Sequence, residues 1–364
     1  MISKACLVGT YQKKLELIAA QPDVDLQVII PPSWNDRSGT ILAERRFTEG
    51  YQLIIDPINF NGSFHTHYYP KLKQRLSNFK PDIVHIDEEP YNLATWLAWR
   101  QSNKVKAKTL FFTWQNINRA YPPPFSWMEK QVLNGVDYAL MGNEDAVTVW
   151  QEKGYRGPYR IIPQFGVDPM LFQPPTRRDS GRPLLIGSAN RRLVPEKGVD
   201  TLLHALADLP GLWRAVIAGE GPEKQNLIQL TRQLGLEGRV SFEGAVSSAD
   251  MPRFLQSLDV LVLSSRTLPN WKEQFGRILI EAMACEVAVV GSSSGEIPHV
   301  IQEAGLTFSE DDVPSLSQQL NSLISSETLR DSLGRQGRQH VLANYTQAKI
   351  ATNTVEVYRE IMAK

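Results

Sequence analysis

Short apolar runs alternate with longer amphipathic stretches along nearly all of the 364 residues. This alternation is typical of parallel strands covered by helices, so it predicts an α/β fold. Amphipathic periodicity in the first half predicts helices over 69–77, 93–101 and 143–153. The strands predicted in the same half are 5–8, 26–30, 52–55, 83–86, 109–113, 138–141 and 160–162.

A proline-rich segment, 163–183, separates this series from a second one. Its composition is that of a stiffened linker, and the chain is too long for one ordinary core. We therefore expect domains at 1–168 and 169–345, followed by a C-terminal segment, 346–364, whose amphipathic helix packs back on the first domain. The strands predicted in the second series are 184–187, 215–218, 240–243, 260–264, 288–291 and 306–308.

Two doubly wound, Rossmann-like parallel sheets facing across a cleft are the architecture that this organisation favours. Ligands of such sheets bind at the carboxyl ends of the strands, where the strand order reverses. Closure of a cleft between two domains also excludes water from a reaction. The candidate site residues are therefore sought in the loops that follow predicted strands.

The charge balance narrows the class of protein. The chain carries 39 basic and 39 acidic residues, whereas a nucleic-acid-binding protein normally has a basic excess, so we expect no nucleic-acid partner. Two cysteines, Cys6 and Cys285, are too few for a disulfide framework or a cysteine zinc site. The sequence shows no secretory h-region and no run of about 18 apolar residues. We expect a cytoplasmic protein, at most lying against the inner face of a membrane.

Two glutamates flank the start of a predicted helix in the second domain. Glu273 and Glu281 are eight residues apart, Gly276 marks the entry to a helix over 277–285, and Glu281 lies within that helix. Two carboxylates beside a helix amino terminus suit a ligand with hydroxyl groups and a diphosphate, which is the composition of a nucleotide sugar. A solvated glutamate next to an ordinary core helix explains the spacing equally well.

A basic loop follows the first predicted strand of the second domain. The segment 187–199, GSANRRLVPEKGV, brings Arg192 and Lys197 together with backbone amides, an arrangement that suits a diphosphate. The spacing is not that of a P-loop. Taken alone, such cations are more often simply exposed to solvent.

The sequences of both segments resemble the motifs of glycosyltransferase family 4, whose members are retaining enzymes of the GT-B fold. The resemblance rests on E-x-F-G followed by E-A-M-A-C around the glutamates, and on R-L-V-x-E-K-G in the basic loop. It implies that Glu273 binds sugar hydroxyls of the donor and that Glu281 holds the ribose. It also implies that Arg192 and Lys197 bind the donor diphosphate.

Shorter matches extend this resemblance over about 120 residues. AGEGP resembles a glycine-rich turn of the family, VSFEGAV a strand and turn that meet the nucleotide base, and SSSGEI a loop near the donor phosphates. Together with the glutamate segment they imply further donor-binding residues: Gly219, Gly244, Val246, Phe275, Gly276, Arg277 and Gly295.

The first domain resembles the family by pattern more than by motif. PDIVHI resembles the strand that delivers a histidine, which makes His85 a catalytic candidate, although a histidine packed inside a strand explains it too. FFTWQN places Gln115 where many members carry the histidine of T-x-H. Glutamine does not titrate near neutral pH, so we expect no general base at Gln115. The segment 9–12 also lacks the usual glycine pair.

Three further features of the first domain bear on the acceptor. The acidic run 87–89 follows a strand and suits either acceptor hydroxyls or solvent. The basic amphipathic stretch 64–80 suits either a membrane surface, and thus a lipid-linked acceptor, or an ordinary crossover helix. His65 and His67 are spaced like a metal pair but lack an evident third ligand, so we expect no metal and no other cofactor.

The resemblance implies a retaining, hexosyltransferase-type glycosyltransferase. It would move a sugar from a UDP- or GDP-linked donor to a glycan or lipid-linked acceptor, in polysaccharide or glycoconjugate biosynthesis. The alternatives are a nucleotide-sugar epimerase of the same fold and a nucleotide-sugar-binding protein without catalysis, to which the glutamine at position 115 lends support.

Overall fold

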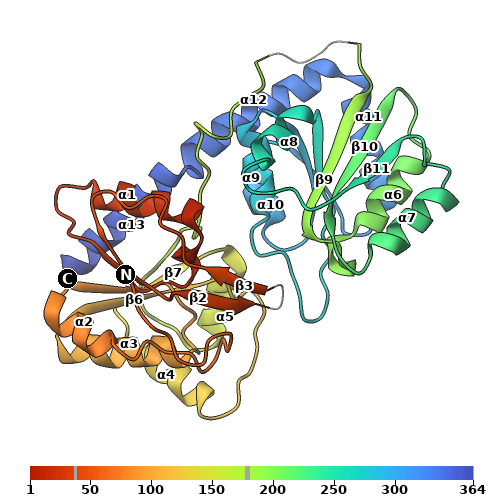
Figure 1. Ribbon diagram of the computed structural model, residues 1–364. Helices are drawn as coiled ribbons and strands as arrows, with labels where there is room; N and C mark the ends of the chain where they lie inside the picture. The colour runs from red at the N-terminus through yellow and green to blue at the C-terminus, as the bar shows by residue number, and fades with distance from the viewer. Residues whose placement is uncertain (37–38, 177–180, 364) are drawn as a thin grey trace. The chain divides into compact units, whose positions relative to one another are not determined.

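A computed structural model describes residues 1–36, 39–176 and 181–363, so residues 177–180 of the predicted linker lie outside the described part. The chain forms two compact units. Unit 1 contains residues 1–166 and 347–364, and unit 2 contains residues 167–346 (Figure 1).

Unit 1 is built on a parallel sheet. Its strands β5 (Ile83–Ile86), β6 (Lys108–Thr113), β7 (Tyr138–Met141) and β8 (Tyr159–Ile161) are adjacent in that order. A second parallel pair, β1 (Gln27–Ile30) and β4 (Gln52–Ile55), is joined to β5 through Ile2, which bridges both Ile29 and Ile86. The helices of this unit before residue 167 are α1 (Lys13–Ala19), α2 (Leu72–Phe79), α3 (Leu93–Lys104), α4 (Phe125–Gly135) and α5 (Glu144–Glu152).

The predicted first strand, 5–8, is wrong. The chain forms two 3₁₀ turns there, η1 (Ala5–Leu7) and η2 (Gly9–Gln12), because the Ser3 hydroxyl accepts a hydrogen bond from the Cys6 amide and starts a turn. Ile2 takes the place in the sheet that was expected for that strand. The antiparallel pair β2 (Ser33–Asp36) and β3 (Gly39–Leu42) was not predicted, because its residues are mostly polar or exposed.

The last helix, α13 (Gln347–Met362), completes the core of unit 1. Its buried Ile350, Val357 and Ile361 pack with residues of β6 and β7. Ala351 and Val355 pack with α1, and Figure 1 shows the two helices side by side. The apolar face of the C-terminal helix therefore packs into a core whose other residues all precede residue 167.

Unit 2 holds a sheet of six parallel strands in the order β11-β10-β9-β12-β13-β14. The strand order reverses between β9 (Leu184–Arg192) and β12 (Val260–Leu263), which makes their carboxyl ends the switch point of the sheet. The other strands are β10 (Trp213–Glu220), β11 (Val240–Glu243), β13 (Ala288–Ser292) and β14 (Leu306–Phe308). The helices are α6 (Val199–Ala207), α7 (Lys224–Gln233), α8 (Met251–Ser257), α9 (Arg277–Ala284), α10 (Ile297–Ile301), α11 (Val313–Ser325) and α12 (Glu327–Asn344).

The two units thus have the predicted class of architecture, α/β with two parallel sheets. Central strands such as β12 and β13 are buried along their whole length. Strands covered on both faces read as unbroken apolar runs, which explains why they were recognisable in the sequence.

Candidate functional site

The loops that follow β9 and β12 meet at the switch point of unit 2. After β9 the chain makes a short 3₁₀ turn, η3 (Pro195–Lys197), whereas Ser264 and Ser265 come directly after β12. The Ser264 hydroxyl donates a hydrogen bond to the Lys197 carbonyl oxygen at 3.0 Å. This bond fixes the basic loop against the segment that leads to the glutamates.

Lys197 and Glu273 form an ion pair at this point. The Lys197 Nζ lies 2.7 Å from Glu273 Oε2, and the Ser265 hydroxyl donates to the same oxygen at 2.9 Å. The Lys197 ammonium also lies 4.5 Å from the centre of the Trp271 ring. Two residues that the sequence places in separate motifs are therefore in direct contact, and both keep some exposure to solvent.

The loop after β13 closes against Glu273. Gly295 has a φ of +54°, and a Cβ at this position would overlap with the Glu273 carbonyl oxygen. The next residue, Glu296, donates its amide to that oxygen at 3.2 Å. Glycine at position 295 thus permits a close backbone approach, which holds the backbone of Glu273 in place.

Helix α9 starts beside this loop and carries the second glutamate. Gly276, in the left-handed conformation, precedes the first turn, and Phe275 is buried against Tyr345. Glu281 is buried and pairs with Arg277 one turn earlier, at 3.0 Å between Nε and Oε1. Burial raises the pKa of the Glu281 carboxyl, and the Arg277 guanidinium opposes that rise.

The other predicted donor residues also lie at or beyond the carboxyl ends of strands in unit 2. Strand β9 continues to Arg192, further than predicted, so this exposed arginine is the last residue of the strand rather than part of the loop. Gly219 lies near the end of β10 and donates its amide to the Gly244 carbonyl oxygen at 3.1 Å. Val246 follows Gly244 in the loop after β11 and is partly exposed.

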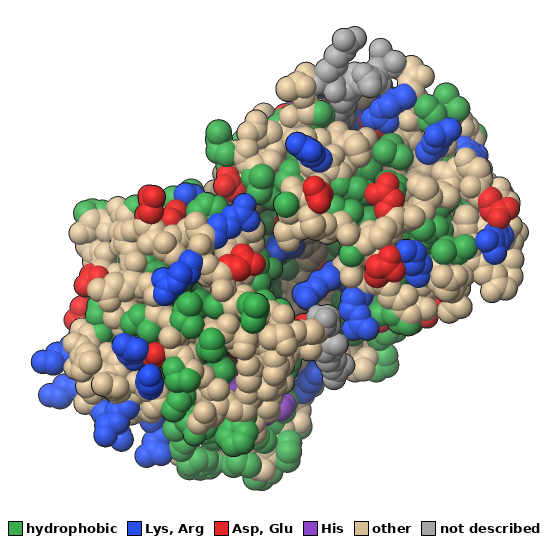
Figure 2. Space-filling model, in the orientation of Figure 1, with side chains coloured by type: hydrophobic (Ala, Val, Ile, Leu, Met, Phe, Trp, Pro, Cys, Tyr) green, Lys and Arg blue, Asp and Glu red, His purple; other side chains and the backbone are tan. Residues whose placement is uncertain are grey.

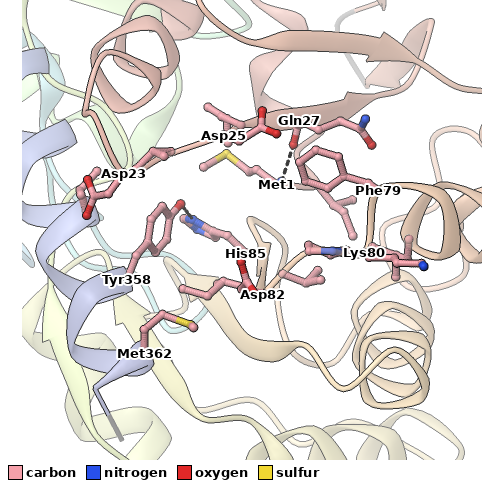
Figure 3. A pocket seen from close by; sticks show the side chains of 18 of the residues that line it. Met1, Asp23, Asp25, Gln27, Phe79, Lys80, Asp82, His85, Tyr358 and Met362 are labelled. Atoms are coloured by element: carbon pink, nitrogen blue, oxygen red, sulfur yellow. Dashed lines mark hydrogen bonds between the residues drawn. The ribbon is translucent and has the colours of Figure 1, made fainter.

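His85 lies in unit 1 within β5, and its ring contacts helix α13. Its Nδ1 is 2.7 Å from the hydroxyl oxygen of Tyr358, and burial lowers its pKa to about 3. Both side chains line a cavity of about 380 Å³ that is also bordered by Asp25, Gln27 and Asp82, near the amino ends of β1 and β5 (Figure 3). The histidine is therefore neutral near pH 7 and faces the end of the sheet opposite the one where ligands of such sheets bind.

Gln115 follows β6 at the carboxyl edge of the sheet in unit 1. Its side chain is buried, its Nε2 donates to the Ile117 carbonyl oxygen at 2.9 Å, and its Oε1 has no partner among the described residues. The backbone amide of Gln115 donates a hydrogen bond to the Thr113 hydroxyl oxygen at 3.1 Å. A buried acceptor without a donor is costly, so this oxygen is the group at this position best suited to a ligand.

Glu89 holds the segment that carries Gln115. Its carboxylate accepts hydrogen bonds from the Thr113 hydroxyl at 2.6 Å and from the Trp114 amide at 2.8 Å. Burial raises the pKa of Glu89 to about 7, against the effect of these two bonds. The sequence showed an acidic run here, but it did not distinguish Glu89 from its neighbours.

The rest of the acidic run is also engaged inside unit 1. Asp87 accepts hydrogen bonds from Ser3 and Gln164, and Glu88 pairs with Lys4. Burial by itself would raise the pKa of Glu88, but Lys4 and His67 lower it to about 2. The run is therefore not a solvated loop.

The residues of the histidine pair and of the basic stretch 64–80 also make contacts inside unit 1. His67 Nδ1 contacts the Ser63 and Phe64 carbonyl oxygens, and His65 lies among aromatic rings. Within the described residues, no group of three or more His, Cys, Asp or Glu side chains is arranged to hold a metal ion. Two apolar residues of α2, Leu72 and Leu76, are part of the core, whereas the third, Phe79, is partly exposed and borders the cavity beside His85. No helix in the described part of the chain is long and apolar enough to cross a membrane.

Comparison with known proteins places this site in a family. A model described as "Glycosyl transferases group 1" matches residues 177–340. The chain is 29% identical over 278 residues to a D-inositol 3-phosphate glycosyltransferase of Mycobacterium ulcerans, and 28% identical over 245 residues to an N-acetyl-alpha-D-glucosaminyl L-malate synthase of Bacillus anthracis. These matches cover 70% and 65% of this chain, but 58% and 62% of those two proteins.

Solved structures match over nearly the whole chain at low sequence identity. A glycosyltransferase from Rickettsia africae superposes with a TM-score of 0.76 at 18% identity, covering 99% of this chain and 97% of that one. HepE from Anabaena, in complex with UDP, gives 0.73 at 16% identity, covering 99% and 98%. At these identities the likeness concerns the fold. The match of residues 177–340 to the glycosyl transferases group 1 model agrees with the predicted family, and the chain has the two-sheet fold of GT-B glycosyltransferases.

Proposed function

We propose that this chain is a retaining glycosyltransferase that transfers a hexose from a nucleoside-diphosphate sugar, UDP- or GDP-linked, to a hydroxyl of a glycan or lipid-linked acceptor. The observation that carries the proposal is the contact of Lys197 with Glu273 at the switch point of unit 2, beside Gly295 and the start of α9. The whole of this donor site lies within the family match.

The site contains two ion pairs whose partners a bound donor would replace. Lys197 is paired with Glu273 and Arg277 with Glu281, so each carboxylate already has a cation. A donor diphosphate would attract Lys197, together with Arg192 and the amino terminus of α9. Sugar hydroxyls would then bind Glu273, and ribose hydroxyls would bind Glu281.

Transfer requires stabilisation of a separating charge pair. The bond between the anomeric carbon and the diphosphate oxygen breaks, positive charge develops on the sugar, and the cations of unit 2 stabilise the departing diphosphate. The acceptor oxygen forms the new bond to the same face of the anomeric carbon, and its proton passes to the leaving phosphate. His85, whose pKa is lowered to about 3 by burial, is too weak a base near pH 7, and Gln115 does not ionise there, which favours this route.

The comparisons favour UDP over GDP as the first nucleotide to test, because the HepE structures contain UDP or UDP-glucose. The two named relatives differ in the acceptor that their names state, so they do not single out an acceptor. We propose a cytoplasmic location and, at most, peripheral membrane contact. Such contact would depend on exposed lysines such as Lys71 and Lys73, because Arg75 of the same helix is paired with Asp56.

The decisive experiment measures nucleoside diphosphate released from UDP-, GDP- and ADP-sugars, with and without glycan acceptors. We expect release by the wild-type protein in the presence of EDTA, because cations of the protein bind the diphosphate. Lys197→Ala should reduce turnover strongly, whereas Arg232→Ala, which removes an exposed ion pair of the same unit, should not. Equal rates in the two variants would contradict the site, and a requirement for a divalent ion would contradict its metal-free operation.

A product analysis separates the alternatives. Conversion of the donor into an epimer without an acceptor would identify an epimerase. Stabilisation by a nucleotide sugar without any release of nucleoside diphosphate would identify a binding protein.

A further inference from the structure

A groove lined by three tryptophans runs between α3 and α4 of unit 1. It has a volume of about 460 Å³. Both helices begin at the carboxyl edge of the sheet, because α3 follows β5 and α4 follows β6. The lining residues are Trp96, Trp99, Arg100, Asn103, Lys104, Trp127 and Gln131.

The three rings differ in how they are held. Trp99 packs closely on Gly135 at the end of α4, where a Cβ would overlap with the indole ring. Trp96 donates its Nε1 to Gln131 Oε1 at 2.8 Å and carries the Arg100 guanidinium over its face at 4.7 Å. These contacts restrict two of the rings before any ligand binds, which lowers the entropy cost of binding.

The third ring is available to a ligand. Trp127 is 53% exposed, and its ring centre lies 5.6 Å from that of Trp96. The amide nitrogen of Gln131 has no protein partner in the described part of the chain, so it can donate to a ligand. Exposed aromatic faces beside planar amide groups suit sugars, whose C–H faces pack on the rings while their hydroxyls bond to the amides.

The charge of the groove indicates which sugars it would take. Its lining residues include two cations, Arg100 and Lys104, and no carboxylate. Figure 2 shows Lys and Arg side chains gathered over the region of unit 1 that contains α2 and α3. A ligand with negative charges would therefore be favoured over a neutral one.

A cluster of aromatic rings lies at the carboxyl edge of the sheet, beside the start of α4. Phe125, the first residue of α4, lies 5.0 Å from His65, which lies 5.2 Å from Tyr121. Tyr121 in turn lies 4.3 Å from Tyr91, in the segment that follows Glu89. Trp127 follows Phe125 by two residues, so this ring cluster and the groove both lie along the first turn of α4.

We propose that the α3–α4 groove binds an acidic oligosaccharide, so that the acceptor is a chain of several sugars carrying carboxylate or phosphate groups. The assignment as an acceptor rests on the proposed function, whereas binding to the groove can be measured without transfer. A groove with a restrained aromatic wall and amide groups fits a sugar chain better than a flat lipid surface. A proline-rich peptide, which also binds aromatic grooves, is the competing ligand.

Affinity electrophoresis in gels that contain polygalacturonate tests the proposal. We expect retardation of the wild-type protein, more than by neutral dextran, and a loss of affinity of about tenfold for Trp127→Ala because one aromatic surface is removed. Trp127→Phe keeps an aromatic face and should restore most of the affinity. Tyr159→Ala, which removes an exposed aromatic ring on β8, is the matched control and should behave like the wild type.

Three results would overturn the proposal. The first is no retardation of the wild type by polygalacturonate, and the second is equal retardation of the wild type and Trp127→Ala. The third is that the wild type ignores polygalacturonate but binds a polyproline peptide or phosphatidylglycerol vesicles, and that Trp127→Ala abolishes this binding. Thermal stabilisation of the wild type by UDP is measured in parallel. Polysaccharide binding without any nucleotide response would remove the proposed function and leave the groove assignment in place.

Discussion

Replacement of Glu89 by glutamine tests whether a carboxyl group with a raised pKa controls the stability of unit 1. The pKa of Glu89 is about 7 in the folded chain, against 4.5 without the fold. Between these values the folded state binds more protons than the unfolded state, so the free energy of unfolding falls as the pH rises. Glutamine cannot ionise, so Glu89→Gln removes this loss.

The magnitude follows from the size of the shift. A shift from 4.5 to about 7 corresponds to about 3 kcal/mol at 1.36 kcal/mol per unit, and the partial exposure of Glu89 reduces this. Relative to wild type, Glu89→Gln should therefore gain about 2 kcal/mol between pH 5 and pH 8. At this size of unit, the gain corresponds to about 4–8 °C in the melting temperature. Loss of the bond from Thr113 adds a constant offset of about 1 kcal/mol, so the slope with pH is the quantity to compare.

Tryptophan fluorescence during urea or thermal unfolding reports mainly on unit 1, because six of the eight tryptophans lie there: Trp34, Trp96, Trp99, Trp114, Trp127 and Trp150. The difference between variant and wild type cancels the other titrating groups. Glu356→Gln, which removes an exposed ion pair with Arg160, is the control for loss of a surface carboxylate. A difference between Glu89→Gln and wild type that stays constant from pH 5 to pH 8 would refute the reasoning.

Three further changes have expected outcomes. Gly295→Ala should lower the free energy of unfolding of unit 2 by about 2 kcal/mol or more, because residue 295 has a positive φ and a Cβ there would overlap with Glu273. Gly238→Ala, at a position with open space around it, is the control and should leave the melting temperature unchanged. Equal melting temperatures of the two variants would contradict the close approach. Tyr358→Phe should cost about 1–2 kcal/mol of unfolding free energy, because it leaves His85 Nδ1 buried without a partner; an unchanged value would argue against that bond. Glu281→Ala should weaken UDP binding about tenfold by calorimetry, and unaltered affinity would remove its ribose role.

Much of the fold could be predicted because parallel strands buried on both faces appear as apolar runs. The bounds of β4, β5, β7, β11 and β14 agree with those expected from the sequence. The first strand failed because a turn started by Ser3 depends on a local hydrogen bond rather than on hydrophobicity. The hairpin of β2 and β3 gave no apolar signal.

In the candidate site, too, local motifs could be predicted from the sequence, whereas contacts between distant segments could not. Motif spacing pointed to Glu273 and Lys197, but their contact depends on which strands are neighbours in the sheet, and this is a property of the fold. The partner of His85, Tyr358, lies 273 residues later in the chain, so no local pattern connects the two. The support of Gln115 by Glu89 depends on the adjacency of β5 and β6 in the same manner.

The position of α13 has a consequence for biosynthesis. Residues 167–346 are translated between the main part of unit 1 and the helix that covers it. Domains fold as units while the chain is made, so unit 2 can fold before α13 leaves the ribosome. Until then the apolar side chains of α1, β6 and β7 that α13 covers stay open to water, and to chaperones that recognise such surfaces. Unit 1 can therefore be the later of the two units to complete its core, although most of its residues precede unit 2.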